Sequence, residues 1–207
     1  NADATEGVVV SLNCETDFVA KNDAFVALAN EMAEKALAFD SLEAFLASDF
    51  GGITVADKLV EQTGVIGEKI EIKSMEKLSA PYVAAYIHAG NQIATLVGLS
   101  ASAAGTEIGR DVAMQVAAMN PIALDETQVS QEVIDRELEI ERDILTKEGK
   151  PANIIDNILK GKLQRFFKDN TLVHQEFIKD NKQTVATYVQ TLGKDVKVTG
   201  YKRVALV

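Results

Sequence analysis

In the first third of the chain, one predicted strand precedes a group of predicted helices and a second strand follows them. Residues 7–14 are apolar and rich in valine, which predicts a buried strand. Residues 69–75 alternate polar with apolar side chains, as a strand with one exposed face does. Between them, residues 25–36 carry apolar side chains every three or four positions, behind a cap at Asn22 or Asp23. Two shorter helical patterns follow, each behind its own capping residue: Ser41 and Thr54.

A similar order of elements recurs further along the chain. Residues 82–88 and 93–100 have the composition of strands, joined by the turn Ala89-Gly90-Asn91-Gln92. Thr106 is expected to cap a helix with a small, apolar buried face that ends at Asn120-Pro121. Because a strand and an alanine-rich helix also occupy residues 7–39, the two halves have the pattern of an internal duplication.

Residues 125–168 predict a pair of amphipathic helices. The first is acidic, and its apolar stripe is formed by Val129, Val133, Ile140 and Ile144, with Ile134, Leu138 and Leu145 alongside. Gly149-Lys150-Pro151 ends it, and the second helix has a basic outer face. We interpret the pair as an antiparallel helical hairpin, a short coiled coil that leaves the second half of the chain. A docking arm and an ordinary packed helix pair fit this pattern equally well.

The remaining elements complete the expected fold class. A helix is predicted at residues 184–192, and an alternating strand at 196–207 is expected to return to the second sheet. The fold class is therefore α+β, with two related subdomains that each place helices on one face of a small antiparallel sheet. We expect an N-terminal core subdomain at 1–78 and a C-terminal core subdomain at 79–207, with the hairpin inserted at about 125–168.

Composition narrows the partners and the compartment. The net charge is −10 and the pI is about 4.7, whereas nucleic-acid binding usually needs a basic surface. Proteins are therefore the expected partners, without direct contact to nucleic acid or membrane. No apolar run approaches the roughly 20 residues that span a bilayer. A single cysteine excludes an internal disulfide and fits a reducing compartment, so we expect a cytoplasmic protein, with the bacterial cytoplasm favoured.

Signatures of catalysis and of cofactor binding are absent from the sequence. There is no phosphate-binding loop of the G-x-x-x-x-G-K-[ST] kind, and neither His88 nor His174 has a second metal ligand at a suitable spacing. Cys14 and His88 could form a nucleophile–base pair, but a thiol at the end of an apolar strand is more commonly a small buried side chain. We therefore expect no cofactor, no metal and no enzymatic activity. A Cys14–His88 hydrolase stays as an alternative that no third group supports.

Residues 16–22 (Thr-Asp-Phe-Val-Ala-Lys-Asn) are unusual for a connection between a strand and a helix. They place a large aromatic side chain, Phe18, where turn residues are expected. In one interpretation Phe18 folds back on the following helix as a hydrophobic staple. In the other it is an aromatic anchor that a rigid loop presents to a partner, as at interface hot spots. The residues alone leave both interpretations open.

The run of residues 13–22 (NCETDFVAKN), with Phe25 just beyond it, closely resembles the signature of translation elongation factor Ts. The resemblance covers essentially the whole chain and continues through three further runs: Ile66-Gly67-Glu68-Lys69-Ile70, Tyr86-Ile87-His88-Ala89-Gly90 and Gly149-Lys150-Pro151. It implies a guanine-nucleotide exchange factor that acts on elongation factor Tu, in its GDP-bound and nucleotide-free states.

The same resemblance implies roles for individual residues. Asp17 and Phe18 would enter the nucleotide-binding domain of the partner near its Mg²⁺ and phosphate region, where the ring disturbs the metal site and loosens GDP. Thr16 and Val19 belong to the same segment. Further positions that match partner contacts of the family are Ile66, Gly67, His88 and Ile178. Lys179, beside Ile178, stands where an apolar contact is expected.

Three expectations concern the protein as a whole. Members of the family normally begin with a small helical domain that resembles a ubiquitin-associated domain, and the residues before Val8 are too few to form it. We therefore expect a core region whose exchange activity has to be tested. A non-exchanging α+β interaction scaffold is the main alternative function, and a homodimer and a monomer satisfy the pattern equally well.

Overall fold

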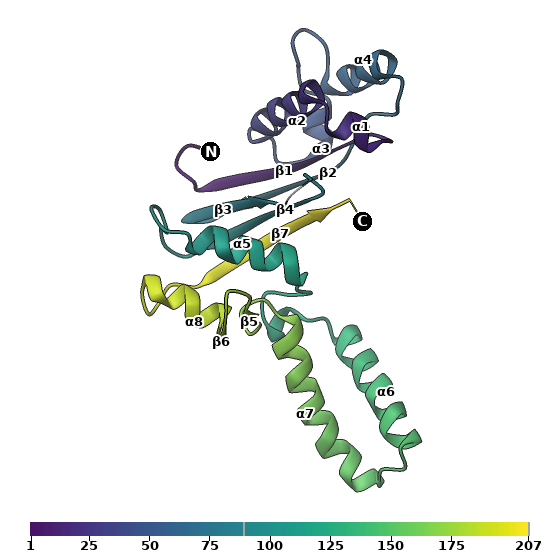
Figure 1. The fold of residues 1–207 in the computed structure, drawn as a ribbon, viewed down its shortest axis with the longest axis vertical. Helices are drawn as coiled ribbons and strands as arrows, with labels where there is room; N and C mark the ends of the chain where they lie inside the picture. The colour runs from purple at the N-terminus through teal and green to yellow at the C-terminus, as the bar shows by residue number, and fades with distance from the viewer. Residues whose placement is uncertain (89, 207) are drawn as a thin grey trace.

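Two small antiparallel sheets lie face to face in the middle of the molecule, with helices on their outer sides (Figure 1). The computed structural model describes residues 1–88 and 90–206. The first sheet pairs β1 (Glu6–Asn13) with β2 (Glu71–Ser79), and the second has the order β3-β4-β7. A small cluster of Val9, Val83 and Leu96 packs between the sheets. The α+β class and the helices on one face of each sheet are confirmed.

Strand β1 is apolar on both faces because both faces are covered. Val8, Val10 and Leu12 pack on the core beneath the first helices, and Val9 faces the second sheet. Alternate side chains of a strand point to opposite faces, so a strand between two layers has no exposed side to make polar. This position explains the continuous apolar run in the sequence.

The helices of the first half begin where the sequence predicted their caps. The Asn22 side chain accepts from the N–H groups of Ala24 and Phe25 at the start of α2 (Asp23–Ala36). Ser41 caps α3 (Leu42–Leu46), and Thr54 forms a capping box with Asp57 at the start of α4 (Val55–Ile66). Their buried faces form one core, whose fully buried members include Met32, Phe45 and Val55.

The second half has its own core beneath the second sheet. Strand β3 (Tyr82–Ile87) pairs with β4 (Ile93–Leu99), and β4 pairs with β7 (Val198–Ala205), so the last strand returns to this sheet as predicted. Helix α5 (Ile108–Met119) packs on the sheet, together with α8 (Val185–Val189) and the 3-10 turn η2 (Gln190–Leu192) that extends it. A polar ribbon of β5 (Glu176–Phe177) and β6 (Asp180–Thr184) was not predicted.

The start of α5 differs in part from its prediction. The expected cap Thr106 lies one residue too early: the residue before α5 is Glu107, in a helical conformation without a capping side chain. The Thr106 hydroxyl donates to the carbonyl of Ala103 and also accepts from the N–H of Ile108 at 3.4 Å, so it still bonds the first residue of α5. In the predicted turn between β3 and β4, Ala89 lies outside the described residues.

The predicted hairpin corresponds to two long helices that project away from the sheets (Figure 1). Helix α6 (Gln131–Lys147) begins later than expected because Asp125 caps a separate 3-10 turn, η1 (Glu126–Gln128), and Ser130 caps α6 itself. Helix α7 (Ala152–Asn170) runs back beside it. Gly149, at a φ of 75°, makes the turn between them, a backbone conformation that glycine adopts without strain.

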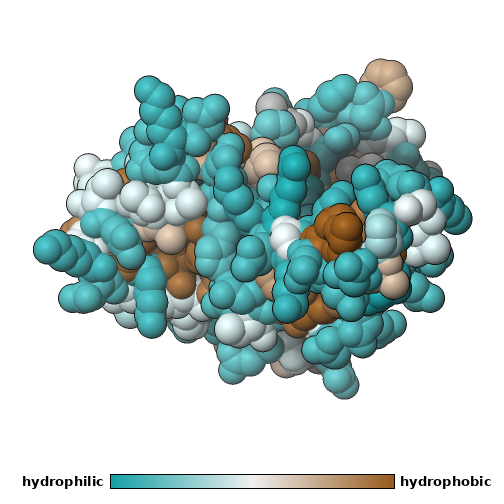
Figure 2. Space-filling model, turned by 90° about the horizontal axis from the view of Figure 1, so that it is seen from below, coloured by the Kyte–Doolittle hydropathy of each residue, from teal (hydrophilic) through white to brown (hydrophobic). Residues whose placement is uncertain are grey.

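The buried face of α6 is the row predicted to lie alongside the main stripe, and not that stripe itself. The two helices meet through Leu145, Ile155 and Leu159, with Leu138 beside them. Within the predicted stripe, Val129 is buried, whereas Val133, Ile140 and Ile144 are exposed. Figure 2 views the molecule from the end where the hairpin projects, and most of that surface is hydrophilic, with small separate hydrophobic patches.

The hairpin is closed at its base by backbone hydrogen bonds. Ile122 donates its N–H to Asn170 at 3.0 Å, and Leu172 and Val173 donate theirs to Ala123 and Leu124 at 3.0 and 3.1 Å. The chain therefore leaves and re-enters the second half at one place. Among the described residues, no helix combines the length and the apolar character needed to cross a membrane.

Candidate functional site

The segment that carries Phe18 is a one-turn helix, α1 (Asp17–Ala20), and not the open turn that its position suggested. Thr16 is extended and caps the helix, because its Oγ1 accepts from the N–H of Val19 at 3.4 Å. Asp17 occupies the first turn, where a negative charge is favourable. The ammonium of Lys21 lies 2.6 Å from the Asp17 carboxylate and lowers its pKa.

Neighbouring side chains of α1 differ sharply in burial. Phe18 is 83% exposed, more than any other large hydrophobic side chain among the described residues. Val19 is partly buried and packs on the core of the first half. The staple interpretation of Phe18 is therefore wrong, since a staple would bury the ring against α2.

The end of α4 lies against the start of α1. The Glu68 carboxylate accepts from the N–H groups of Glu15 and Thr16, each at 3.0 Å, and from the Thr16 hydroxyl at 2.5 Å. Gly67 terminates α4 at a φ of 80°, in the left-handed region where a side chain would be strained. Ile66 is partly buried against the core of the first half. The structure thus brings residues 16–19 and 66–67 together.

The other two predicted contact residues belong to the second half. His88 is exposed just beyond β3, and its Nδ1 lies 3.1 Å from the Tyr86 hydroxyl. Ile178 is 41% exposed in the turn between β5 and β6, and its N–H donates to Gln115 Oε1 at 2.9 Å. Within the described part of the chain, no hydrogen bond joins either residue to α1.

A buried carboxylate that no sequence pattern indicated holds the turn next to Ile178. Asp111 of α5 is 4% exposed, and its Oδ1 lies 2.5 Å from the ammonium of Lys179. Its Oδ2 accepts from the Tyr188 hydroxyl at 2.8 Å, and the Tyr188 ring stacks on Phe177. Lys179 therefore makes an ion pair where an apolar contact was expected. A buried charge needs such partners, and here they come from residues far apart in the sequence.

The hydroxyl of Tyr188 is expected to titrate late. Burial, and then the hydrogen bond to Asp111, raises its pKa from an ordinary value of 10.0 to about 12. Because the folded pKa is raised, the stabilisation by this hydroxyl is fully present below pH 10 and is lost as the pH rises toward 12. Ultraviolet titration of the wild-type chain should show one tyrosine ionising near pH 12 that is missing from the titration of Tyr188→Phe. A difference centred near pH 10 would contradict the buried hydrogen bond.

The alternative Cys14–His88 pair gains no support from the structure. The Cys14 thiol donates to the carbonyl of Thr16 at 3.2 Å, while His88 pairs with Tyr86. Burial, and then the charge of Glu68, raises the pKa of the thiol, which disfavours the nucleophilic thiolate. Among the described residues, no three His, Cys, Asp or Glu side chains gather in a group that could hold a metal ion.

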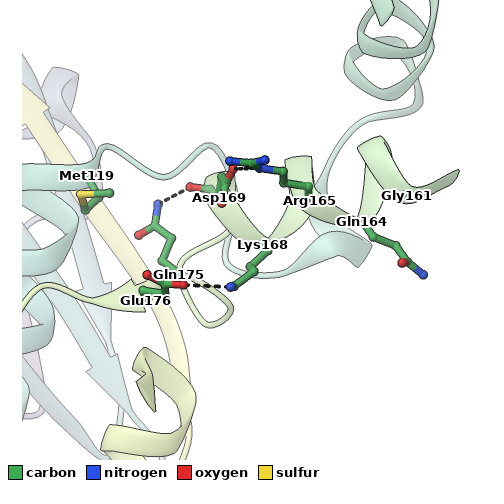
Figure 3. A pocket seen from close by; sticks show the side chains of 8 residues that line it. All are labelled: Met119, Gly161, Gln164, Arg165, Lys168, Asp169, Gln175 and Glu176. Atoms are coloured by element: carbon green, nitrogen blue, oxygen red, sulfur yellow. Dashed lines mark hydrogen bonds and ion pairs between the residues drawn. The ribbon is translucent and has the colours of Figure 1, made fainter. Parts of the chain in front are cut away.

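A depression of about 620 Å³ lies where the hairpin joins the second half (Figure 3). Its charged side chains are paired with each other: Arg165 with Asp169 at 3.4 Å, and Lys168 with Glu176 at 2.9 Å. Gln175, which is 2% exposed, donates to the Asp169 carbonyl at 3.1 Å. None of the predicted contact residues lines this depression. The pair of Lys168 with Glu176 joins α7 to β5, whereas the pair of Arg165 with Asp169 lies within α7.

Comparison with known proteins supports the resemblance that the segment around α1 carries. The model of the family described as Elongation factor TS matches residues 15–206. The chain belongs to the elongation factor Ts family. Its sequence is 60% identical to the Elongation factor Ts of Christiangramia forsetii over 207 residues, which is all of this chain and 76% of that protein. The Elongation factor Ts of Flavobacterium psychrophilum gives the same identity and coverage.

A more distant relative matches over nearly the same extent. The Elongation factor Ts of Porphyromonas gingivalis is 42% identical over 203 residues, which cover 96% of this chain and 73% of that protein. The resemblance of residues 13–22 to the elongation factor Ts signature is therefore confirmed at the level of the family, and translation elongation is the process in which this family works. The contact roles of residues 16–19, 66–67, 88 and 178 stay predictions.

Proposed function

We propose that the chain is a guanine-nucleotide exchange factor for elongation factor Tu, and that it promotes GDP release by docking Asp17 and Phe18 near the Mg²⁺ and phosphate region of the partner. The exposure of Phe18 carries this proposal: an aromatic ring that is 83% exposed stands on a short helix capped at its start. Exposing a large apolar side chain to water is unfavourable for the free chain. Burying the same side chain against a partner is favourable.

The free energy of burying the Phe18 ring gives an estimate of its effect on binding. Full burial of a phenylalanine side chain is worth about 1.5–3 kcal/mol, or roughly ten- to a hundredfold in an equilibrium constant. That amount is a substantial part of the coupling between two ligands of one protein, which is typically 1–3 kcal/mol. If the ring is buried only in the nucleotide-free complex, Phe18 provides a useful fraction of the free energy that opposes GDP binding, but not all of it.

No chemical step by this chain is needed. If the exchange factor and GDP each weaken the binding of the other to elongation factor Tu, the coupling is reciprocal by thermodynamic linkage. Stabilising the nucleotide-free partner then speeds GDP release, and the nucleotide that binds next displaces the factor. The chain acts in this proposal as a binding protein without a cofactor, in the bacterial cytoplasm where translation takes place.

The remaining predicted contacts extend the surface on both halves. Ile66 and Gly67 lie beside α1 because Glu68 joins the two segments, so they would meet the same domain of the partner. His88 and Ile178 are exposed on the second half and would contact a different part of it. The two groups support a partner that spans both halves.

Release of a fluorescent GDP analogue from elongation factor Tu tests the proposal. The chain should accelerate release in a saturable manner, and Cys14→Ser should do so equally well because the thiol has no chemical role. If saturating protein leaves the release rate unchanged but still binds nucleotide-free elongation factor Tu, the non-exchanging scaffold is the correct function. Loss of exchange in Cys14→Ser would instead restore a chemical role for the thiol.

A further inference from the structure

Glu68 lies at the junction of the two segments that the proposed function brings to the partner. Its carboxylate accepts three hydrogen bonds, from the N–H groups of Glu15 and Thr16 and from the Thr16 hydroxyl. The two backbone donors immediately precede α1, so a carboxylate there complements the positive end of the short helix. The Thr16 hydroxyl, and then its N–H and that of Glu15, lower the pKa of Glu68.

The Thr16 hydroxyl has no hydrogen left to donate to a partner, because its single hydrogen is bonded to Glu68. The same hydroxyl accepts from the N–H of Val19. Thr16 therefore links Glu68 to the first turn of α1. The geometry favours an internal role for Thr16, in place of the direct partner contact that the family resemblance implied.

Helix α1 depends on such links for its orientation. It has four residues and no buried side chain, and Val19 is only partly buried against the core. A single helical turn is not stable by itself, because nucleation fixes several residues for one hydrogen bond. Asn22 fixes the chain after α1 as the cap of α2, and Glu68 fixes the chain before it. The direction of Phe18 follows from these two anchors.

We propose that Glu68 is a positioning residue: through Thr16 and the backbone at Glu15 it holds α1 in the orientation that presents Phe18 to the partner. The proposal rests on the proposed exchange function, in which Phe18 is the contacting side chain. Glu68 itself is engaged with its own chain. Removing its carboxylate should therefore loosen α1 without removing any group that touches the partner.

The first experiment observes α1 without any partner. The chain contains no tryptophan, so Phe18→Trp introduces a single reporter on α1. Adding Glu68→Ala should raise the amplitude of fast local motion in the time-resolved anisotropy of that tryptophan, and Glu68→Gln should have a smaller effect. Glu71→Ala is the matched control, because Glu71 is close in sequence and, among the described residues, its side chain forms an ion pair with Lys69 alone. Unchanged anisotropy in Glu68→Ala would overturn the proposal.

The second experiment measures exchange with the full chain and elongation factor Tu. Glu68→Ala should reduce the efficiency of GDP release by about tenfold, as expected when a contact is no longer pre-organised, with an unchanged melting temperature. In a Phe18→Ala background the same substitution should have almost no further effect, since the positioned side chain is gone. Independent, additive losses would show that Glu68 acts elsewhere and would overturn the positioning role.

The two experiments separate the possible failures. If the wild-type chain does not accelerate GDP release, the proposed function fails, whatever the anisotropy shows. If the wild-type chain is active and Glu68→Ala exchanges equally well despite a more mobile tryptophan, the positioning role alone is wrong. Glu71→Ala should match the wild-type chain in both measurements.

Discussion

Phe18→Ala is expected to reduce the efficiency of GDP release from elongation factor Tu by roughly ten- to a hundredfold, while the free energy of unfolding changes by less than about 0.5 kcal/mol. The two effects separate because the ring is 83% exposed in the free chain and would be buried only in the complex. Release of a fluorescent GDP analogue gives the first quantity, and urea denaturation of the free chain gives the second.

Val60→Ala is a suitable control for this variant. Val60 lies on α4 in the same half, and it is 72% exposed, so the substitution also removes an exposed apolar side chain. It should leave both exchange and stability close to those of the wild-type chain. If Phe18→Ala exchanges as fast as the wild-type chain, insertion of the ring cannot be the step that loosens GDP.

Gln115→Leu is expected to destabilise the fold by about 3 kcal/mol, out of a total that is typically 5–15 kcal/mol. Gln115 is fully buried, donates to the Gln175 side chain and the Glu176 carbonyl at 3.1 Å each, and accepts from the N–H of Ile178. Leucine has a similar size but satisfies none of these groups, and each buried polar group left without a partner costs about 1–3 kcal/mol.

Gln164→Leu makes the same chemical change at an exposed position of α7 and should alter stability by no more than about 0.5 kcal/mol. Urea denaturation of the two variants provides the comparison. A loss below about 1 kcal/mol in Gln115→Leu would mean that the ribbon of β5 and β6 finds other partners. Because Gln115 also fixes the backbone at Ile178, the variant should weaken the contact proposed for that residue.

The elements that could be predicted from the sequence are those whose cause is local. Asn22, Ser41 and Thr54 bond the first turn of the helix that follows each of them, so a cap can be recognised without knowing the fold. The valine-rich run of β1 and the alternation of β7 are likewise visible in the residues of each strand, although the layers on either side explain them. The main stripe predicted for α6 was the wrong row, because two apolar rows run along that helix and only the position of α7 decides which is buried.

The candidate site was partly predictable for the same reason. The run of residues 13–22 identified the family, but the staple and the anchor interpretations of Phe18 differ only in exposure, which depends on the packing of α1. Helix α1 has too few residues to show a period. The pair of Lys179 with Asp111 and the bonds from Thr16 to Glu68 join positions 68 and 52 residues apart, which no sequence spacing indicates.

The closed base of the hairpin has a consequence for how this protein can vary. Three backbone hydrogen bonds, from Ile122, Leu172 and Val173, bring the two ends of the arm together independently of what lies beyond them. Loop-closure entropy rises only slowly with length, by about 0.6 kcal/mol for each doubling of a flexible loop. Insertions or deletions of whole helical turns in α6 and α7 should therefore be tolerated by the rest of the fold. The arm can change its reach during evolution, or be shortened by design, while α1 and the sheets keep their geometry.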